Sequence, residues 1–306
     1  MKIVSLIPSA TEIVCSLGLI NNLVGISHEC DYPQGIEKLP KLTKSKVDVN
    51  ETSYNINENI QSILEKGLSV YEVDSELLQK IDPDVIITQS HCSVCAVSIE
   101  DVKKCLNLWL KKKPILIDLK PNYFKDVIND ILFVGEKLNA SNEASKVIEI
   151  INKEINVIKK KLNFTNTKKV LCIEWIEPLM IAGNWIPEIL RISNAENVLI
   201  ESGKNSKFIS TSELSSNKFD IVIFMPCGFD IRRTKLEIKK SNLNFHSLLK
   251  QKEVFVVDGN KFFNRPGPRL LESIKILCEI IHPDVFKPEP SLERWISVNL
   301  SEQKLV

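Results

Sequence analysis

An excess of charge of one sign is absent from this sequence of 306 residues, in which 40 lysines and arginines nearly balance 39 aspartates and glutamates. A nucleic-acid-binding surface or a polybasic membrane anchor needs an excess of positive charge. The short basic runs at 111–113 and 159–161 fall at the ends of predicted helices, where they complement the helix dipole. We therefore expect no nucleic-acid partner.

Long apolar runs are also missing. No window approaches the ~18 apolar residues that a membrane-spanning helix requires. The first apolar stretch, Ile3–Ile7, is short, and Pro8 follows it directly, whereas a secretory signal needs ~7–15 apolar residues behind a basic start. These absences predict no membrane insertion and a cytoplasmic location, in which the eight cysteines are mostly reduced.

The common catalytic motifs are absent as well. The sequence contains no Gly-x-x-x-x-Gly-Lys phosphate loop, no Gly-x-Gly-x-x-Gly turn after its first strand and no Gly-x-Ser-x-Gly elbow. It contains only four histidines, and His246 and His282 lie in predicted helical or tail segments. This pattern favours a protein that binds a small molecule over an enzyme that turns one over.

The chain alternates short apolar runs with stretches of helical period, which is typical of parallel α/β units. The fold class that this predicts is α/β, with two Rossmann-like lobes built on parallel sheets. The predicted strands are Ile3–Ile7, Leu23–Ser27, Val85–Gln89, Ile115–Asp118, Val170–Trp175, Asn197–Ile200, Ile221–Met225 and Val254–Asp258. The predicted helices are Ser9–Leu19, Ile56–Lys66, Ser98–Lys111, Pro187–Ser193, Lys235–Lys250 and Pro268–Ile281.

A segment without strands separates the two halves. Residues 123–162 have helical spacing only, and a helix from Ser141 to Leu162 would be ~33 Å long at 1.5 Å per residue. We therefore predict an N-terminal α/β lobe of residues 1–140, a connecting helix of residues 141–163 and a C-terminal α/β lobe of residues 164–306. The ligand cleft is expected between the lobes. The proline-rich tail after His282 is expected to be extended and anchored by Trp295.

Ligands of parallel sheets bind beyond the carboxyl ends of the strands, so the residues that follow each predicted strand are candidates for binding. Ser9 follows the first strand. It either caps a helix, with Glu12 completing a capping box, or lies in a turn that holds an anion. His28, Glu29 and Cys30 follow the second strand and gather several ligating groups in one short loop.

A Cys-x-x-Cys pair, Cys92 and Cys95, follows Gln89 and has three interpretations. With His28 and Cys30 it would form a four-ligand site suited to zinc or iron. Alternatively, the pair forms a redox disulfide, or the thiols line a ligand pocket. The competing functions are a thiol enzyme, with one of these cysteines as nucleophile and His28 as base, and a metal-sensing or scaffold protein with structural zinc.

The second half of the chain offers five further candidates. Glu174, Trp175 and Cys227 lie at predicted strand ends, and Trp185 follows soon after. The two tryptophans are either flat walls of a ligand site or core residues. Arg265 lies in a loop stiffened by prolines, where it would bind a carboxylate or other anion, unless the segment is simply the start of a helix.

These segments together resemble a known family. The stretches 3–12, 23–27 and 81–88 are similar to the iron-siderophore and cobalamin class of substrate-binding proteins, the helical-backbone metal receptors. The resemblance covers roughly residues 2–285. The stretches 27–33, 92–95, 183–185 and 265–269 resemble one branch of that class, labelled cobalamin-binding or transporter-associated, whose members commonly lack a signal peptide.

The resemblance implies two α/β lobes bridged by a rigid helix, with the ligand held in the cleft and little hinge closure. It implies a corrinoid such as cobalamin, or another metal-containing cofactor, as the small-molecule ligand, and a transporter or cofactor-handling protein as partner. No catalytic residue is expected. The predicted ligand-binding residues are Ser9, His28, Glu29, Cys30, Gln89, Glu174, Trp175, Trp185, Cys227 and Arg265, and the predicted metal ligands are His28, Cys30, Cys92 and Cys95.

Overall fold

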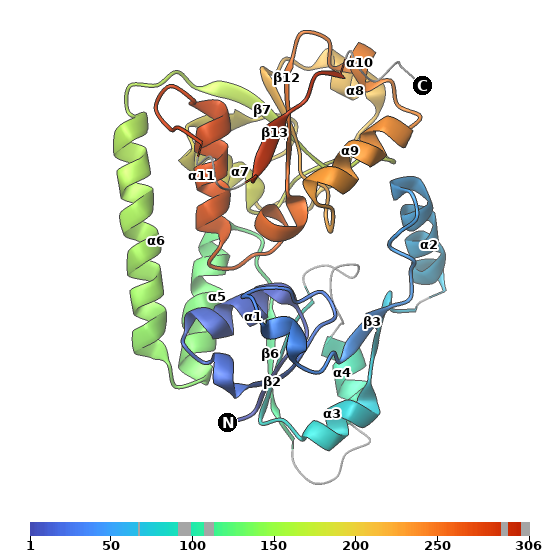
Figure 1. Ribbon diagram of the computed structural model, residues 1–306, viewed down its shortest axis with the longest axis vertical. Coiled ribbons are helices and arrows are strands. Elements are labelled where there is room, and N and C mark those ends of the chain that lie inside the picture. Colours follow the sequence, from blue (N-terminus) through green and yellow to red (C-terminus); the bar gives the residue numbers. More distant parts are fainter. Residues whose placement is uncertain (67, 91–98, 107–112, 289–292, 301–306) are drawn as a thin grey trace. The chain divides into compact units, whose positions relative to one another are not determined.

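The computed structural model describes the chain except for residues 67, 91–98, 107–112, 289–292 and 301–306 (Figure 1). The chain forms two compact units. Unit 1 comprises Met1–Glu51, Asn55–Pro121 and Lys125–Glu149, and unit 2 comprises Thr52–Tyr54, Asn122–Phe124 and Ile150–Val306. Each unit contains its own mainly parallel sheet with helices around it, which confirms the predicted α/β class.

Unit 1 is built on a four-stranded parallel sheet in the order β2-β1-β5-β6. The inner strands β1 (Ile3–Ser5) and β5 (Val85–Gln89) are buried at every position, which explains their largely unbroken apolar sequences. The outer strands are β2 (Leu23–Ile26) and β6 (Ile115–Leu119). The helices that lie wholly or mainly in this unit are α1 (Pro8–Ser16), α2 (Ser53–Glu65), α3 (Ser75–Ile81), α4 (Ile99–Leu106) and α5 (Phe124–Lys137).

Unit 2 contains a seven-stranded sheet in the order β10-β8-β7-β11-β12-β13, with β9 also paired to β7. The strands β7, β9, β11 and β12 run parallel, and the antiparallel strands β8, β10 and β13 extend the sheet at its two sides. Their bounds are β7 (Lys168–Trp175), β8 (Met180–Ile181), β9 (Ala195–Asn197), β10 (Lys207–Phe208), β11 (Ile221–Phe224), β12 (Glu253–Val257) and β13 (Trp295–Ser297). The helices are α7 (Ile186–Ile192), α8 (Thr211–Ser216), α9 (Ile231–Lys240), α10 (Phe245–Leu248), α11 (Leu270–Ile281) and the π-helical turn η3 (Gly259–Phe263).

Several predicted elements differ from the structure by a few residues at their ends, and two differ more. The predicted strand Asn197–Ile200 is wrong beyond Asn197, because Leu199 has φ 78° and cannot continue an extended chain. The predicted helix Lys235–Lys250 is broken into α9 and α10. The break occurs where the Glu177 carboxylate accepts hydrogen bonds from the Ser241 hydroxyl (3.0 Å) and the Asn242 amide (3.1 Å).

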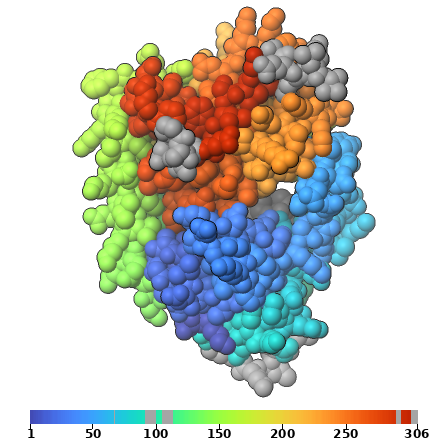
Figure 2. Space-filling model, viewed as in Figure 1, coloured from blue at the N-terminus to red at the C-terminus, as the bar shows by residue number. Residues whose placement is uncertain are grey.

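The predicted long helix is present as α6, which spans Ser141–Leu162. Its apolar stripe is buried, with Ala144 fully inaccessible and Ile155 6% exposed, and its opposite side forms the light-green surface in Figure 2. Three lysines close its last turn, where they oppose the negative end of the helix dipole. Among the described residues, no helix combines the length and the apolar character that crossing a membrane requires.

The tail after α11 is anchored as predicted by Trp295. This residue opens β13, which pairs antiparallel with β12 at the side of the sheet in unit 2. Its indole N–H donates to Glu279 Oε2 at 2.9 Å, and its ring meets Phe255 edge-on at a centroid distance of 5.5 Å. Residues 295–297 of the tail therefore become part of the sheet.

Candidate functional site

The loop after β2 in unit 1 holds His28 in a fixed position. The half-buried imidazole lies 2.7 Å through Nδ1 from the Thr43 hydroxyl, which also accepts the His28 backbone N–H at 3.1 Å. The ring packs at a tilt against Tyr71, with 5.6 Å between centroids. Burial and the nearby Lys41 ammonium lower the pKa of His28 below its ordinary value, so the imidazole is neutral at physiological pH.

The two residues after His28 face different surroundings. Glu29 is exposed, and its carboxylate accepts a hydrogen bond from the Tyr71 hydroxyl at 3.3 Å. Cys30 is only 2% exposed, and its Sγ lies 3.1 Å from the hydroxyl of Thr11 in α1. The Lys41 ammonium donates to the Cys30 carbonyl at 2.8 Å and helps to hold the loop in place. The structure thus directs the Cys30 thiol to the interior.

The predicted metal site remains a prediction. Cys92 and Cys95 lie outside the described residues. Within the described part of the chain, no group of three or more histidine, cysteine, aspartate or glutamate side chains could hold a metal ion.

The side chains of Ser9, in α1, and Gln89, the last residue of β5, meet in unit 1. The Ser9 hydroxyl lies 3.4 Å from Gln89 Oε1, and both side chains are buried. The predicted capping box of Ser9 and Glu12 is wrong, because α1 is preceded by Ile7 at its N-cap and begins with Pro8. Proline fits the first helical position without a capping side chain. The Ser9 hydroxyl is therefore directed to the neighbouring strand end.

In unit 2, Glu174 lies at the carboxyl end of β7, where the pairing with β8 shifts register between Ile173 and Trp175. Such a bulge re-aims the side chains beside it. The Ser206 hydroxyl donates to the Glu174 carboxylate, and the Gly183 amide donates to the same hydroxyl at 3.1 Å. Burial raises the pKa of Glu174, and the hydrogen bonds from Ser206 and Gly183 partly offset that rise.

Gly183 is a position where a side chain has no room. A Cβ added there would lie 2.2 Å from the Lys204 carbonyl oxygen and 2.8 Å from the Ser206 nitrogen, both backbone atoms. We predict that Gly183→Ala lowers the free energy of unfolding by about 2–3 kcal/mol, because the loop at 204–206 must move away. Chemical denaturation followed by circular dichroism measures this loss.

The matched control for that prediction is Gly228→Ala. Gly228 has φ 74°, but a Cβ there would meet nothing within 4 Å, so the expected loss is only about 1 kcal/mol from backbone strain. Equal losses in the two variants would contradict the close packing described for Gly183.

Trp175 and Cys227 lie next to Glu174. The Cys227 amide donates to the Glu174 carbonyl at 3.2 Å, and both Cys227 and Trp175 are half-buried. The Trp175 indole N–H donates to the Ser53 carbonyl at 3.1 Å. Its ring is backed by Phe229, with 5.2 Å between centroids. A half-buried indole with a fixed orientation therefore lies at the strand ends of unit 2.

Phe229 and Arg233 extend this group. Phe229 is 5% exposed, and the Arg233 guanidinium lies over its ring at 5.0 Å from the centroid. Neither residue was among the predicted site residues, although Phe229 follows β11 and could have been chosen by the same rule as Cys227. Arg233 carries no comparable sequence signal, because only the start of α9 brings it over the ring.

The remaining two candidates are in the interior of unit 2. Trp185 is 6% exposed, and its indole N–H donates to the Phe263 carbonyl at 2.9 Å. Arg265 is 4% exposed, and its Nη2 donates to Asn260 Oδ1 at 3.1 Å. The structure therefore brings Glu174, Trp175 and Cys227 together and places Trp185 and Arg265 against the η3 segment.

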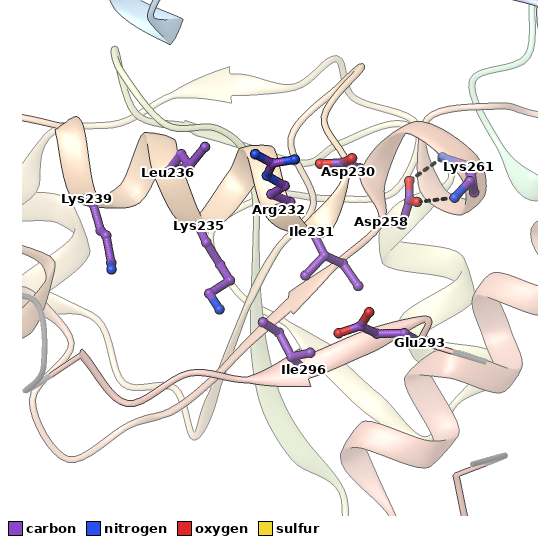
Figure 3. A pocket seen from close by; sticks show the side chains of 10 residues that line it. All are labelled: Asp230, Ile231, Arg232, Lys235, Leu236, Lys239, Asp258, Lys261, Glu293 and Ile296. Carbon is purple, nitrogen blue, oxygen red and sulfur yellow. Dashed lines mark hydrogen bonds and ion pairs between the residues drawn. The ribbon is translucent and has the colours of Figure 1, made fainter. Parts of the chain in front are cut away.

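A surface concavity of about 470 Å³ lies elsewhere in unit 2, between α9, the start of η3 and β13 (Figure 3). Charges of both signs line it, including Lys235 and Glu293, and Lys261 forms an ion pair with Asp258 at 3.0 Å. None of the predicted site residues belongs to its lining. We therefore do not assign it to the candidate site.

The sequence matches one protein family and several individual proteins. The model of the periplasmic binding protein family matches residues 3–246. The chain is 24% identical over 293 residues to the uncharacterized ABC transporter substrate-binding lipoprotein YvrC of Bacillus subtilis (strain 168), covering 94% of this chain and 81% of that protein. It is 21% identical over 280 residues to the vitamin B12-binding protein of Vibrio parahaemolyticus serotype O3:K6 (strain RIMD 2210633), covering 91% of this chain and 88% of that protein.

Solved structures show the same fold. A periplasmic heme binding protein from Pseudomonas aeruginosa superposes with a TM-score of 0.71 at 16% identity, covering 97% of this chain and 98% of that one. The periplasmic vitamin B12 binding protein BtuF of Vibrio cholerae superposes with a TM-score of 0.63 at 16% identity, covering 94% and 98%. At these identities the similarity concerns the fold and not the ligand.

Proposed function

The chain belongs to the periplasmic binding protein family, and we propose that it is a substrate-binding protein of the ABC transporter type whose ligand is cobalamin or a related corrinoid. Membership of the family implies a small-molecule ligand and a transporter partner. The corrinoid assignment is the finer part of the proposal. It rests on one group of side chains in unit 2 and on the relatives that are named as vitamin B12-binding.

The observation that carries the proposal is the half-buried indole of Trp175 at the end of β7. A large flat ligand binds well against an aromatic face, because apolar area is buried with little loss of side-chain freedom. The hydrogen bond to Ser53 and the ring of Phe229 hold the indole in place before any ligand arrives. A preorganised aromatic face of this kind suits a corrin ring.

Polar groups beside the indole suit the periphery of such a ligand. Glu174, with its raised pKa, can donate a hydrogen bond when protonated, and Cys227 offers a half-buried thiol. In unit 1, the half-buried His28 and the exposed Glu29 remain proposed ligand-binding residues. Carbonyl and amide groups on a corrinoid periphery would be recognised by such donors and acceptors.

The competing thiol-enzyme function finds little support among the described cysteines. Burial raises the pKa of Cys15 and of Cys278 to about 12, and it raises the pKa of Cys172 as well. Thiols in such surroundings stay protonated at neutral pH and are poor nucleophiles. Of the three thiols in that hypothesis, Cys30 is buried against Thr11, and Cys92 and Cys95 lie outside the described residues. We therefore propose ligand binding without turnover.

A calorimetric titration of the purified protein tests the proposal. Cyanocobalamin, haemin and a ferric siderophore are offered separately, because relatives of this fold bind vitamin B12 or haem. We expect saturable binding of cyanocobalamin at one molecule per chain, and weaker or no binding of the other two. Tight binding of haemin with none of cyanocobalamin would overturn the corrinoid assignment and leave the family intact.

The role of Trp175 is tested in the same titration. Trp175→Ala removes the aromatic face, and we expect the affinity for cyanocobalamin to fall about 10-fold or more. Trp175→Phe keeps a smaller flat face and should lose less. Phe164→Ala is the control. It also removes an aromatic ring, but from a side chain that is 97% exposed. An unchanged affinity in Trp175→Ala would remove the observation on which the proposal depends.

A further inference from the structure

The hydroxyl groups around His28 restrict which of its ring nitrogens carries the proton. Thr43 Oγ1 makes three contacts: with the His28 backbone N–H at 3.1 Å, with His28 Nδ1 at 2.7 Å and with Ser27 Oγ at 3.0 Å. A hydroxyl has one proton to donate and two lone pairs. Because the backbone N–H always donates, it occupies one lone pair. One lone pair and one proton remain for Nδ1 and Ser27.

Two arrangements satisfy Thr43. In the first, Thr43 donates to Nδ1 and accepts from the Ser27 hydroxyl. In the second, Nδ1–H donates to Thr43, and Thr43 donates to Ser27. The two differ in what happens to the Ser27 proton, since Ser27 Oγ already accepts the Glu29 backbone N–H at 3.4 Å.

The Ser27 hydroxyl decides between them. Ser27 is 3% exposed and Thr43 is 6% exposed, so neither hydroxyl can rely on bulk water. In the first arrangement every donor has an acceptor. In the second, no other acceptor for the Ser27 proton exists among the described residues, and a buried hydroxyl without an acceptor is strongly disfavoured. The first arrangement is therefore favoured, with Nδ1 unprotonated and the proton on Nε2.

From this geometry we propose that Thr43 holds His28 in the Nε2–H tautomer and that His28 donates a hydrogen bond from Nε2 to an acceptor oxygen of the ligand. The ligand group is a carboxylate, a carboxamide carbonyl or a phosphate oxygen. This half of the inference rests on the proposed ligand-binding function, whereas the tautomer does not. Nε2 has no hydrogen-bond acceptor among the described residues, and the ring is only half-buried.

The same geometry argues against His28 as a metal ligand. Coordination requires an unprotonated nitrogen, and the accessible nitrogen is the protonated one. Moving the proton to Nδ1 would reverse the Thr43 hydrogen bond and leave the Ser27 proton without an acceptor. Thr43 is therefore a positioning residue that sets what His28 offers to a ligand.

The tautomer is measured on the ligand-free protein by long-range ¹H–¹⁵N correlation NMR at neutral pH. The four histidines are few enough to assign, and His28→Gln identifies the His28 signals. We expect Nε2 to show the shift of a protonated nitrogen and Nδ1 that of an unprotonated one. In Thr43→Val, which keeps the shape but removes the hydroxyl, the tautomer preference should weaken, and Thr43→Ser should restore it. A protonated Nδ1 in the wild-type protein would overturn the proposal.

The ligand half is tested with substitutions at His28. Glutamine places an N–H near the position of Nε2, so His28→Gln should keep the affinity for cyanocobalamin within about 3-fold, whereas His28→Leu should lose about 10-fold. Equal losses in both variants, or a change in the cobalt spectrum that only His28 produces, would show metal ligation instead. If the wild-type protein binds no corrinoid at all, the proposed function fails while the NMR result still decides the tautomer.

Discussion

Replacing Glu279 by glutamine is expected to lower the free energy of unfolding of unit 2 by about 3–5 kcal/mol, because it removes the buried counter-charge of the Arg294 guanidinium. Glu279 and Arg294 are each 7% exposed and form an ion pair. The second Glu279 oxygen accepts the Trp295 indole N–H at 2.9 Å. Arg294 also reaches Glu272 at 3.1 Å, but Glu272 is more exposed and cannot compensate alone.

The loss should be accompanied by release of the tail. β13 pairs with β12 at the side of the sheet in unit 2, and Glu279 on α11 is its main polar anchor. Urea denaturation followed by tryptophan fluorescence gives the free energy, and hydrogen exchange at 295–297 reports the pairing. Glu253→Gln is the control, since Glu253 is 59% exposed and its ion pair with Lys168 is 3.8 Å long. Similar losses in the two variants would contradict the anchoring role of Glu279.

Replacing Asp130 by asparagine is expected to have the second large effect, a change in folding stability that depends on pH. Burial, together with Asp126 and Asp118, raises the pKa of Asp130 from 3.8 to about 7. Its Oδ2 is buried without a hydrogen-bond partner among the described residues. Folding therefore favours the protonated form. At 1.36 kcal/mol per pKa unit, ionising this group in the folded protein costs up to about 4 kcal/mol.

The sign of the pH dependence follows from that raised pKa. Below pH 3.8 the carboxyl is protonated in both states, and its contribution to stability is fully present. As the pH rises towards 7 the folded state binds more protons than the unfolded state, so stability falls. Asp130→Asn mimics the protonated form, and we expect it to stabilise the protein at pH 8 and to have little effect near pH 4.

Thermal denaturation of both proteins across this pH range measures the difference. Glu136→Gln is the control on the same helix, because Glu136 is 71% exposed and its ion pair with Lys137 is 3.6 Å long. A stability difference for Asp130→Asn that does not change with pH would contradict the assigned pKa.

The elements that the sequence predicted well are those with a strong local pattern. β5 has the predicted bounds because five buried residues lie between charged and polar neighbours. α6 has the predicted bounds because its apolar stripe repeats over six turns of helix. β3 (Thr43–Ser45) and β4 (Tyr71–Val73) have no such pattern. These two strands form by pairing with each other across the sequence between them. The spacing of apolar residues within each segment does not reveal that pairing.

The same distinction applies to the candidate site. His28 and Trp175 were found because each lies at or just after the carboxyl end of a strand, β2 or β7. Thr43, fifteen residues beyond His28, was missed because a long-range bridge between Ile26 and Lys41 brings this segment beside the end of β2. Trp185 was predicted to form a wall of the ligand site. Its indole N–H instead donates a hydrogen bond to the carbonyl of Phe263, 78 residues away. Long-range contacts of this kind decide which side of an aromatic residue remains accessible, and a single sequence does not contain them.

The proposed corrinoid ligand is tested most directly by the visible spectrum and cobalt content of protein purified from a corrinoid-fed host. We expect corrinoid absorbance and close to one cobalt atom per chain, with both reduced in Trp175→Ala prepared in parallel. A colourless, cobalt-free protein that also fails to take up cyanocobalamin when it is offered would contradict the claim.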